Sequence, residues 1–111
     1  MGVIQIFSYL LLMKIIIKES KIDLLMTEYL NSWVDSKLIQ KFDRFIVLED
    51  PVGEPENEVD MEYDGSDGRL WFRKDFRNLL TDLFGKSQDE IMIFVGKYFE
   101  HKFGVQVNKV E

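Results

Sequence analysis

The chain has 111 residues, of which 46% are hydrophobic, and a net charge of −6 at pH 7, so it fits one domain that can bury a core without covalent staples. The absence of Cys excludes disulfides, thiolate nucleophiles and Cys-based zinc sites, and it favours a reducing, cytoplasmic setting. The acidic balance argues against general binding to nucleic acids or anionic membranes, because contacts with phosphates need clustered Lys and Arg.

The apolar N-terminal segment is distinct from the single domain expected over residues 13–111. Residues 2–13 are almost entirely apolar, but the run is too short to span a bilayer, and Lys14 ends it. It also lacks the basic start and the small-residue cleavage site of a signal peptide. Two interpretations stay open: residues 3–7 form an extra strand, or Met13 is the real start and residues 1–12 are an upstream extension.

A strand and a long amphipathic helix are predicted next. Lys14–Lys18 is rich in β-branched residues, which is typical of a strand, and Ser20 then offers an oxygen that can cap a helix. Apolar residues recur at helical spacing from Ile22 to Val34, and the apolar residues between positions 38 and 42 nearly continue the stripe. The spacing therefore predicts a helix from Ser20 to about residue 40.

Three strands should follow this helix. Phe45–Leu48 is an apolar run of strand length, and the two prolines and the glycine within residues 50–57 indicate a mobile surface loop. Residues 58–64 alternate between acidic and apolar side chains, and residues 69–73 form the return strand of a hairpin. The expected register, which makes both faces consistent, places Met61 opposite Phe72, Glu62 opposite Trp71, Tyr63 opposite Leu70, Asp64 opposite Arg69 and Asp60 opposite Arg73.

Two helices and a short strand complete the predicted domain. The first helix covers residues 76–84 and ends at Gly85, and the second begins with a capping box at Ser87-Gln88-Asp89-Glu90 and ends at Gly104. Because Ile91–Val95 is apolar all round, the second helix should be the most buried. Valines between residues 105 and 110 indicate the last strand. The order strand, helix, three strands, two helices, strand predicts an α+β fold, with a mostly antiparallel sheet of four to five strands covered on one face by helices.

The negative charge is concentrated in the middle of the chain. Between Phe45 and Gly68 there are nine of the 20 acidic residues and none of the 14 basic ones. A local field of this kind is typical of a recognition surface, a cation site or one side of an internal charge pairing. The residues proposed to contact a partner are Glu58, Asp60, Glu62, Asp64, Arg69, Trp71 and Arg73.

A metal site is the first alternative for this acidic segment. Asp60, Glu62 and Asp64 carry the hard oxygens that calcium and magnesium prefer, and Asp60–Gly65 mimics the opening of an EF-hand loop. The match fails at position twelve, where Trp71 stands in place of a bidentate Glu. The sequence therefore predicts no metal, cofactor or catalytic residue, while a divalent-metal-dependent enzyme stays open as an alternative.

One cluster is both basic and aromatic. Arg69, Trp71 and Arg73 alternate on the return strand, and a Trp flanked by Arg is typical of a protein interface. The same interleaving can bind nucleic acids, but here the neighbouring carboxylates would repel a phosphate backbone. His101, the only histidine, lies in the last turn of a helix, where a partial positive charge is favourable, so it is given a structural role.

The beginning of the expected domain resembles small uncharacterised proteins of marine tailed phages. The resemblance covers about twenty of the 111 residues and begins with the stretch Met13-Lys14-Ile15-Ile16-Ile17-Lys18-Glu19-Ser20, in which a short strand leads into the cap of an amphipathic helix. It implies a compact accessory protein without a catalytic motif, and it favours the Met13 start.

The sequence predicts a small soluble protein, without a membrane span, that binds a macromolecule through its acidic loop and hairpin. The partner is another protein or a second copy, in which case the acidic face of one copy would meet the Arg69–Arg77 cluster of the next. A further alternative is a nucleic-acid mimic, because alternate residues on a strand lie about 6.5–7 Å apart, close to the phosphate spacing along a nucleic-acid strand.

Overall fold

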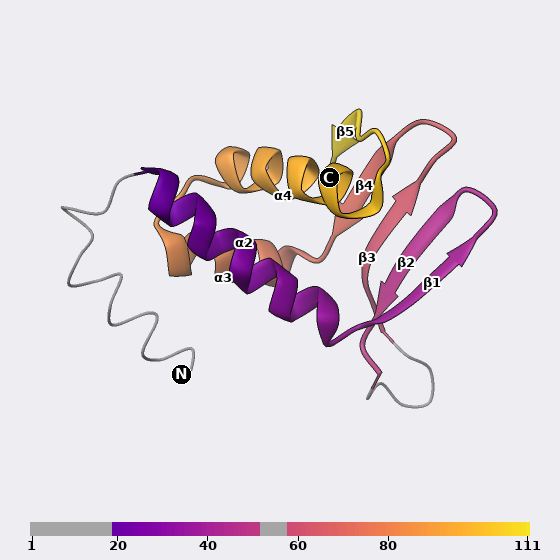
Figure 1. The fold of residues 1–111 in the computed structure, drawn as a ribbon, viewed down its shortest axis with the longest axis horizontal. Coiled ribbons are helices and arrows are strands. Elements are labelled where there is room, and N and C mark those ends of the chain that lie inside the picture. The colour runs from indigo at the N-terminus through magenta and orange to yellow at the C-terminus, as the bar shows by residue number, and fades with distance from the viewer. Residues whose placement is uncertain (1–18, 52–57) are drawn as a thin grey trace.

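The computed structural model describes residues 19–51 and 58–111 of the chain (Figure 1). The predicted N-terminal extension at residues 1–12, the predicted strand Lys14–Lys18 and most of the predicted loop at residues 50–57 lie outside these residues. The elements in chain order are α2 (Glu19–Asp35), β1 (Leu38–Phe42), β2 (Phe45–Glu49), β3 (Val59–Asp64), β4 (Arg69–Phe72), α3 (Lys74–Phe84), α4 (Gln88–Phe103) and β5 (Lys109–Val110).

The sheet confirms the predicted fold class. Its five strands lie in the order β1-β2-β3-β4-β5, in which the first four are successively antiparallel and β5 pairs parallel to β4. The described part of the chain is therefore a single α+β domain with a mixed, mostly antiparallel sheet and three helices. In the described part of the chain, no helix is long and apolar enough to cross a bilayer.

The core lies between one face of the sheet and the helices. Apolar residues at alternate positions of β2, β3 and β4 pack against apolar residues of α2, α3 and α4 in one cluster. Aromatic rings join the helices to each other and to the sheet: Trp33 of α2 stacks on Phe76 of α3 with 4.1 Å between ring centres, and Phe72 of β4 meets the edge of the same ring. Burial of such large side chains is the main source of stability in a domain of this size.

The hairpin β3–β4 has the predicted register. Met61 lies opposite Phe72, Glu62 opposite Trp71, Tyr63 opposite Leu70 and Asp64 opposite Arg69. The apolar members of these pairs face the core, where Met61, Tyr63, Leu70 and Phe72 are all buried. The alternation of side chains along the two strands therefore holds from Met61 to Phe72.

The prediction that the first helix continues to residue 40 is wrong. Helix α2 ends at Asp35, and Leu38–Phe42 forms β1, which pairs with β2 through a two-residue turn at Asp43-Arg44. Asp43 adopts a positive φ of 52° in this turn. Residues 38–42 nearly fit a helical stripe, but pairing with the apolar strand β2 decides their structure, because tertiary contacts override weak local preferences. The described element order is therefore helix, four strands, two helices, strand.

The predicted ends of α3 and α4 are confirmed. Gly85 and Gly104 have φ values of 65° and 66° at the C-caps, and Ser87 and Glu90 form both hydrogen bonds of the capping box. The prediction that the second of these helices is the most buried is not met: four of the 16 residues of α4 are buried, against four of the 11 residues of α3, and Ile93 of the apolar run is 58% exposed. The last strand is also shorter than expected and contains only Lys109 and Val110.

Candidate binding surfaces

The face of the sheet that points away from the helices carries an apolar and aromatic surface. Its members follow from the strand register, because residues directly opposite each other lie on the same face. We call it the outer face; it comprises Leu38, Gln40, Phe42, Phe45, Val47, Glu49, Val59, Glu62, Asp64, Arg69 and Trp71. Phe42 and Phe45 stack with 5.9 Å between ring centres, and Val47 is buried without belonging to the main core.

Trp71 occupies the middle of the β3–β4 half of the outer face. The indole is 38% exposed, so a large part of an aromatic side chain meets solvent. It borders two hollows of about 490 and 270 Å³, the first also lined by Phe45 and Glu62 and the second by Val59 and Arg73. An aromatic ring between two depressions presents both an anchor and space for side chains of a partner.

Asp60 does not belong to this surface, which corrects the predicted binding face. A bulge breaks the alternation at the start of β3: Leu48 lies opposite Met61 and Glu49 opposite Val59, so Asp60 has no partner on β2. The side chain turns inward, where the residue is 8% exposed, and its Oδ2 lies 2.7 Å from Nζ of Lys37. Although the angles are not those of a hydrogen bond, this contact is a close ion pair.

Glu58, Arg69 and Arg73 of the predicted face each form their own contacts within the chain. Glu58 Oε2 accepts a hydrogen bond of 2.7 Å from Arg73, whose guanidinium also lies 3.8 Å from Asp60 Oδ1. Arg69 pairs with Asp67 at 2.6 Å and with Glu111 at 3.7 Å, rather than with its cross-strand neighbour Asp64. These contacts raise the pKa of both guanidinium groups above the ordinary arginine value.

The Asp64 side chain stabilises the turn of the β3–β4 hairpin. Its Oδ1 accepts hydrogen bonds from the backbone N–H of Ser66 at 2.9 Å and from the Ser66 hydroxyl at 2.6 Å. Because both bonds favour the ionised form, the pKa of Asp64 lies below its ordinary value. Glu62, in contrast, is exposed beside Trp71, and its carboxylate forms no ion pair or hydrogen bond with any other described residue.

The structure does not bring the three predicted metal ligands together. Asp60 points to Lys37, Glu62 to solvent and Asp64 to Ser66. Among the residues that the structure describes, no three His or acidic side chains lie close enough to hold a metal ion. The predicted head-to-tail assembly has little support for a similar reason, because Arg69 and Arg73 pair with acidic residues of their own chain and Arg77 packs over the Phe72 ring at 5.2 Å.

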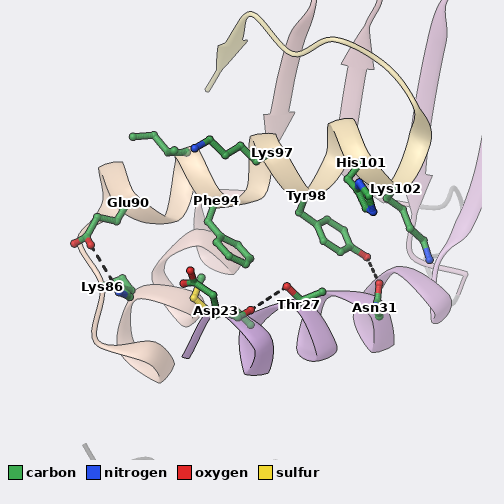
Figure 2. Close-up of a pocket in the computed structure, with 12 residues that line it drawn as sticks. Asp23, Thr27, Asn31, Lys86, Glu90, Phe94, Lys97, Tyr98, His101 and Lys102 are labelled. Atoms are coloured by element: carbon green, nitrogen blue, oxygen red, sulfur yellow. Dashed lines mark hydrogen bonds and ion pairs between the residues drawn. The ribbon is translucent and has the colours of Figure 1, made fainter. Parts of the chain in front are cut away.

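A separate groove lies on the helical side of the molecule, between α2 and α4 (Figure 2). This groove has a volume of about 660 Å³, and Phe94 and Tyr98 of α4 point across it toward α2. The Tyr98 hydroxyl donates a hydrogen bond of 2.7 Å to Asn31 Oδ1, and burial together with the nearby Asp35 carboxylate raises the pKa of Tyr98 to about 12. Lys97, His101 and Lys102 lie along the rim of the groove (Figure 2).

Sequence reasoning missed this groove, because its walls come from helices about 70 residues apart in the chain. The available signal is the apolar run Ile91–Val95, which is wider than one helical stripe and from which the sequence predicts the most buried helix. Ile93 instead lines the open groove. His101 is exposed and lies in the last turn of α4, which is the position predicted from the sequence.

Comparisons with known proteins give no family for this chain: no protein-family model matches it, and neither curated proteins nor solved structures gave a significant match.

Proposed function

We propose that the chain is a protein-binding module and that its partner docks on the outer face around Trp71. The observation that carries the proposal is the position of this indole, 38% exposed between two hollows on the apolar sheet face opposite the helices. Interface hot spots are enriched in Trp and in Arg, and they lie where apolar side chains surround a central anchor. Val59 and Phe45, which line the larger hollow beside Trp71, supply such surroundings.

The charges around Trp71 favour a partner with a cationic side chain. Most carboxylates near the hairpin are already paired within the chain, since Glu58 pairs with Arg73 and Asp67 with Arg69. Glu62, directly opposite Trp71 in the sheet, has no such pair among the described residues. A Lys or Arg of the partner would therefore find an aromatic ring and a carboxylate side by side, which are the two groups that attract a cation.

The same geometry favours a protein partner over the two alternatives. A nucleic-acid mimic needs a regular row of carboxylates, and the row is broken because Asp60 turns inward to Lys37. A metal-dependent enzyme needs ligands that converge on one point, but the Glu62 side chain is exposed to solvent and that of Asp64 is bonded to Ser66. An apolar surface with an aromatic centre contributes to neither of these functions, whereas it accounts for protein binding directly.

The test is a quantitative capture experiment with matched variants. The tagged chain, Trp71→Ala, Glu62→Lys and the control Leu79→Ala would be used to capture proteins from an extract of the source cells. Leu79 is an exposed apolar residue of α3, so its truncation removes a similar exposed group outside the outer face. We expect a protein that the parent and Leu79→Ala retain and that Trp71→Ala and Glu62→Lys lose. Equal retention by all four proteins would contradict the proposal.

A further inference from the structure

The edge strand β1 is unusually apolar for a strand that, among the described strands, is paired on one side only. It is the first strand of the sheet and pairs only with β2 among the described strands (Figure 1). All five residues are exposed, and three of them are large and apolar: Leu38 is 44%, Ile39 41% and Phe42 53% exposed. Proteins usually protect such edges with proline, bulges or several charges, and β1 has only Lys41.

The free backbone groups of β1 can be assigned from its pairing. Phe42 pairs with Phe45 across a two-residue turn, so their backbone groups bond to each other. Because the direction of these groups alternates along an antiparallel strand, Ile39 and Lys41 direct their N–H and C=O groups away from β2. The edge therefore offers two donors and two acceptors to a further strand.

We propose that β1 pairs in antiparallel fashion with β1 of a second copy, with Gln40 at the two-fold axis, to form a continuous ten-stranded sheet. In this register Ile39 lies opposite Lys41 of the second copy, and the four free groups of each strand find partners. Leu38 lies opposite Phe42 of the second copy, so the exposed apolar side chains meet each other. All five residues of β1 take part.

Neighbouring registers are less favourable for the same five residues. A shift by two residues in one direction places Lys41 opposite Lys41 of the second copy, and Ile39 opposite Asp43. A shift in the other direction places Lys41 opposite Lys37 and Leu38 opposite Gln40. Like charges directly opposite each other destabilise a sheet, and either shift separates Leu38 from Phe42. In the central register Leu38 meets Phe42 of the second copy and no two lysines lie opposite each other, which is the reason to choose a second copy as the occupant.

This pairing is independent of the proposed partner site, because it uses the edge of the sheet and not the surface around Trp71. It also differs from an assembly of acidic and basic faces. Backbone hydrogen bonds and apolar contacts are screened little by salt, so the dimer should persist at high ionic strength, whereas an assembly of opposite charges should dissociate.

Single cysteines provide the sharpest test, because the chain contains none. Gln40→Cys places two thiols opposite each other in a pair without hydrogen bonds, where the Cα atoms lie about 4.5 Å apart and within the range of a disulfide. Leu38→Cys places the thiols about 14 Å apart along the strands, so we expect its oxidative cross-linking to be slower by about tenfold or more. Both residues are exposed, and the second is therefore a matched control for random collisions.

Sedimentation velocity supplies the second measurement. The parent chain should form a dimer as its concentration rises through the micromolar range, at low and at high salt. Ile39→Pro removes an outward N–H that the β1–β2 ladder does not use, so we expect it to weaken the dimer by about tenfold while circular dichroism stays that of the parent. Ile39→Val, which keeps the N–H, is the control.

Two results would overturn the proposal. One is a parent chain that stays monomeric at every concentration, which would leave the edge to a strand of another protein. The other is equal cross-linking of Gln40→Cys and Leu38→Cys, which would show collision without a defined register. Neither result depends on whether Ile39→Pro folds, because one uses the parent chain and the other uses the two cysteine variants.

Discussion

Replacement of Lys37 should destabilise the fold, because the inward-facing carboxylate of Asp60 would lose its ion-pair partner. Lys37 lies just after α2, with its Nζ 2.7 Å from Asp60 Oδ2 and 5.0 Å from the centre of the Trp33 ring. The Lys37 and Asp60 side chains are only 13% and 11% exposed. This ion pair therefore ties the junction between α2 and β1 to the bulge of β3.

The expected loss of stability depends on which charges still lie near Asp60 when Lys37 is replaced. Breaking a buried ion pair costs about 3–5 kcal/mol, because the remaining charge stays buried without its partner. In Lys37→Met, however, Arg73 still lies 3.8 Å from the other oxygen of Asp60. We therefore expect a loss at or just below the lower end of that range, about 2–3 kcal/mol of the free energy of unfolding. Asp60→Asn should cost about 1–2 kcal/mol, because Lys37 keeps its contact with the Trp33 ring.

Urea unfolding of the two single variants and of the double variant Lys37→Met/Asp60→Asn measures the coupling. We expect the double variant to be more stable than the sum of the single effects allows, by about 1–2 kcal/mol, because neither charge is then left alone. Lys97→Met, at an exposed position of α4, is the control and should lie within about 0.5 kcal/mol of the parent. Additive single effects, or single variants as stable as the control, would refute the reasoning.

Three further changes test the local structure. Gly68→Ala should cost about 1–3 kcal/mol in urea unfolding, because φ is 71° and the new Cβ would lie 2.5 Å from Nδ2 of Asn108; a stable variant would contradict this. Ser87→Ala should cost about 1 kcal/mol, since the hydroxyl accepts the Glu90 N–H, and thermal unfolding would register the loss. The raised pKa of Tyr98 means that the folded state holds its proton more tightly, so stability should fall as the pH rises from 10 toward 12; the fall should be smaller in Tyr98→Phe, and an unchanged pH profile would refute it.

The hairpin and the helix caps could be predicted because their signals are local. In β3 and β4 the alternation of apolar and polar residues and the glycine-containing turn permit only one register that satisfies both faces, which is the observed one. Similarly, Ser87 and Glu90 are three residues apart, so their reciprocal hydrogen bonds depend on a single helical turn.

The parts that could not be predicted depend on contacts distant in the sequence. Residues 38–42 fit a helical stripe almost as well as a strand, and their turn places Asp43 at a positive φ without a glycine. A bulge leaves no mark in a period-two pattern, so Asp60 was expected on the outer face, although its partner Lys37 lies 23 positions earlier. Of the residues predicted to form the binding face, Trp71 and Glu62 are therefore exposed as expected, whereas Asp60 lies on the inner side of the strand.

Site-specific photo-crosslinking tests the central claim, that a protein partner docks around Trp71, most directly. Benzoylphenylalanine would replace Val59, which borders the same hollow as Trp71, and in a second protein it would replace the exposed Leu79 of α3. After irradiation in an extract of the source cells, mass spectrometry should find one defined partner attached at position 59, no such product at position 79, and loss of the product when Trp71→Ala is added. The same products at both positions, or a product at position 59 that survives Trp71→Ala, would contradict the account.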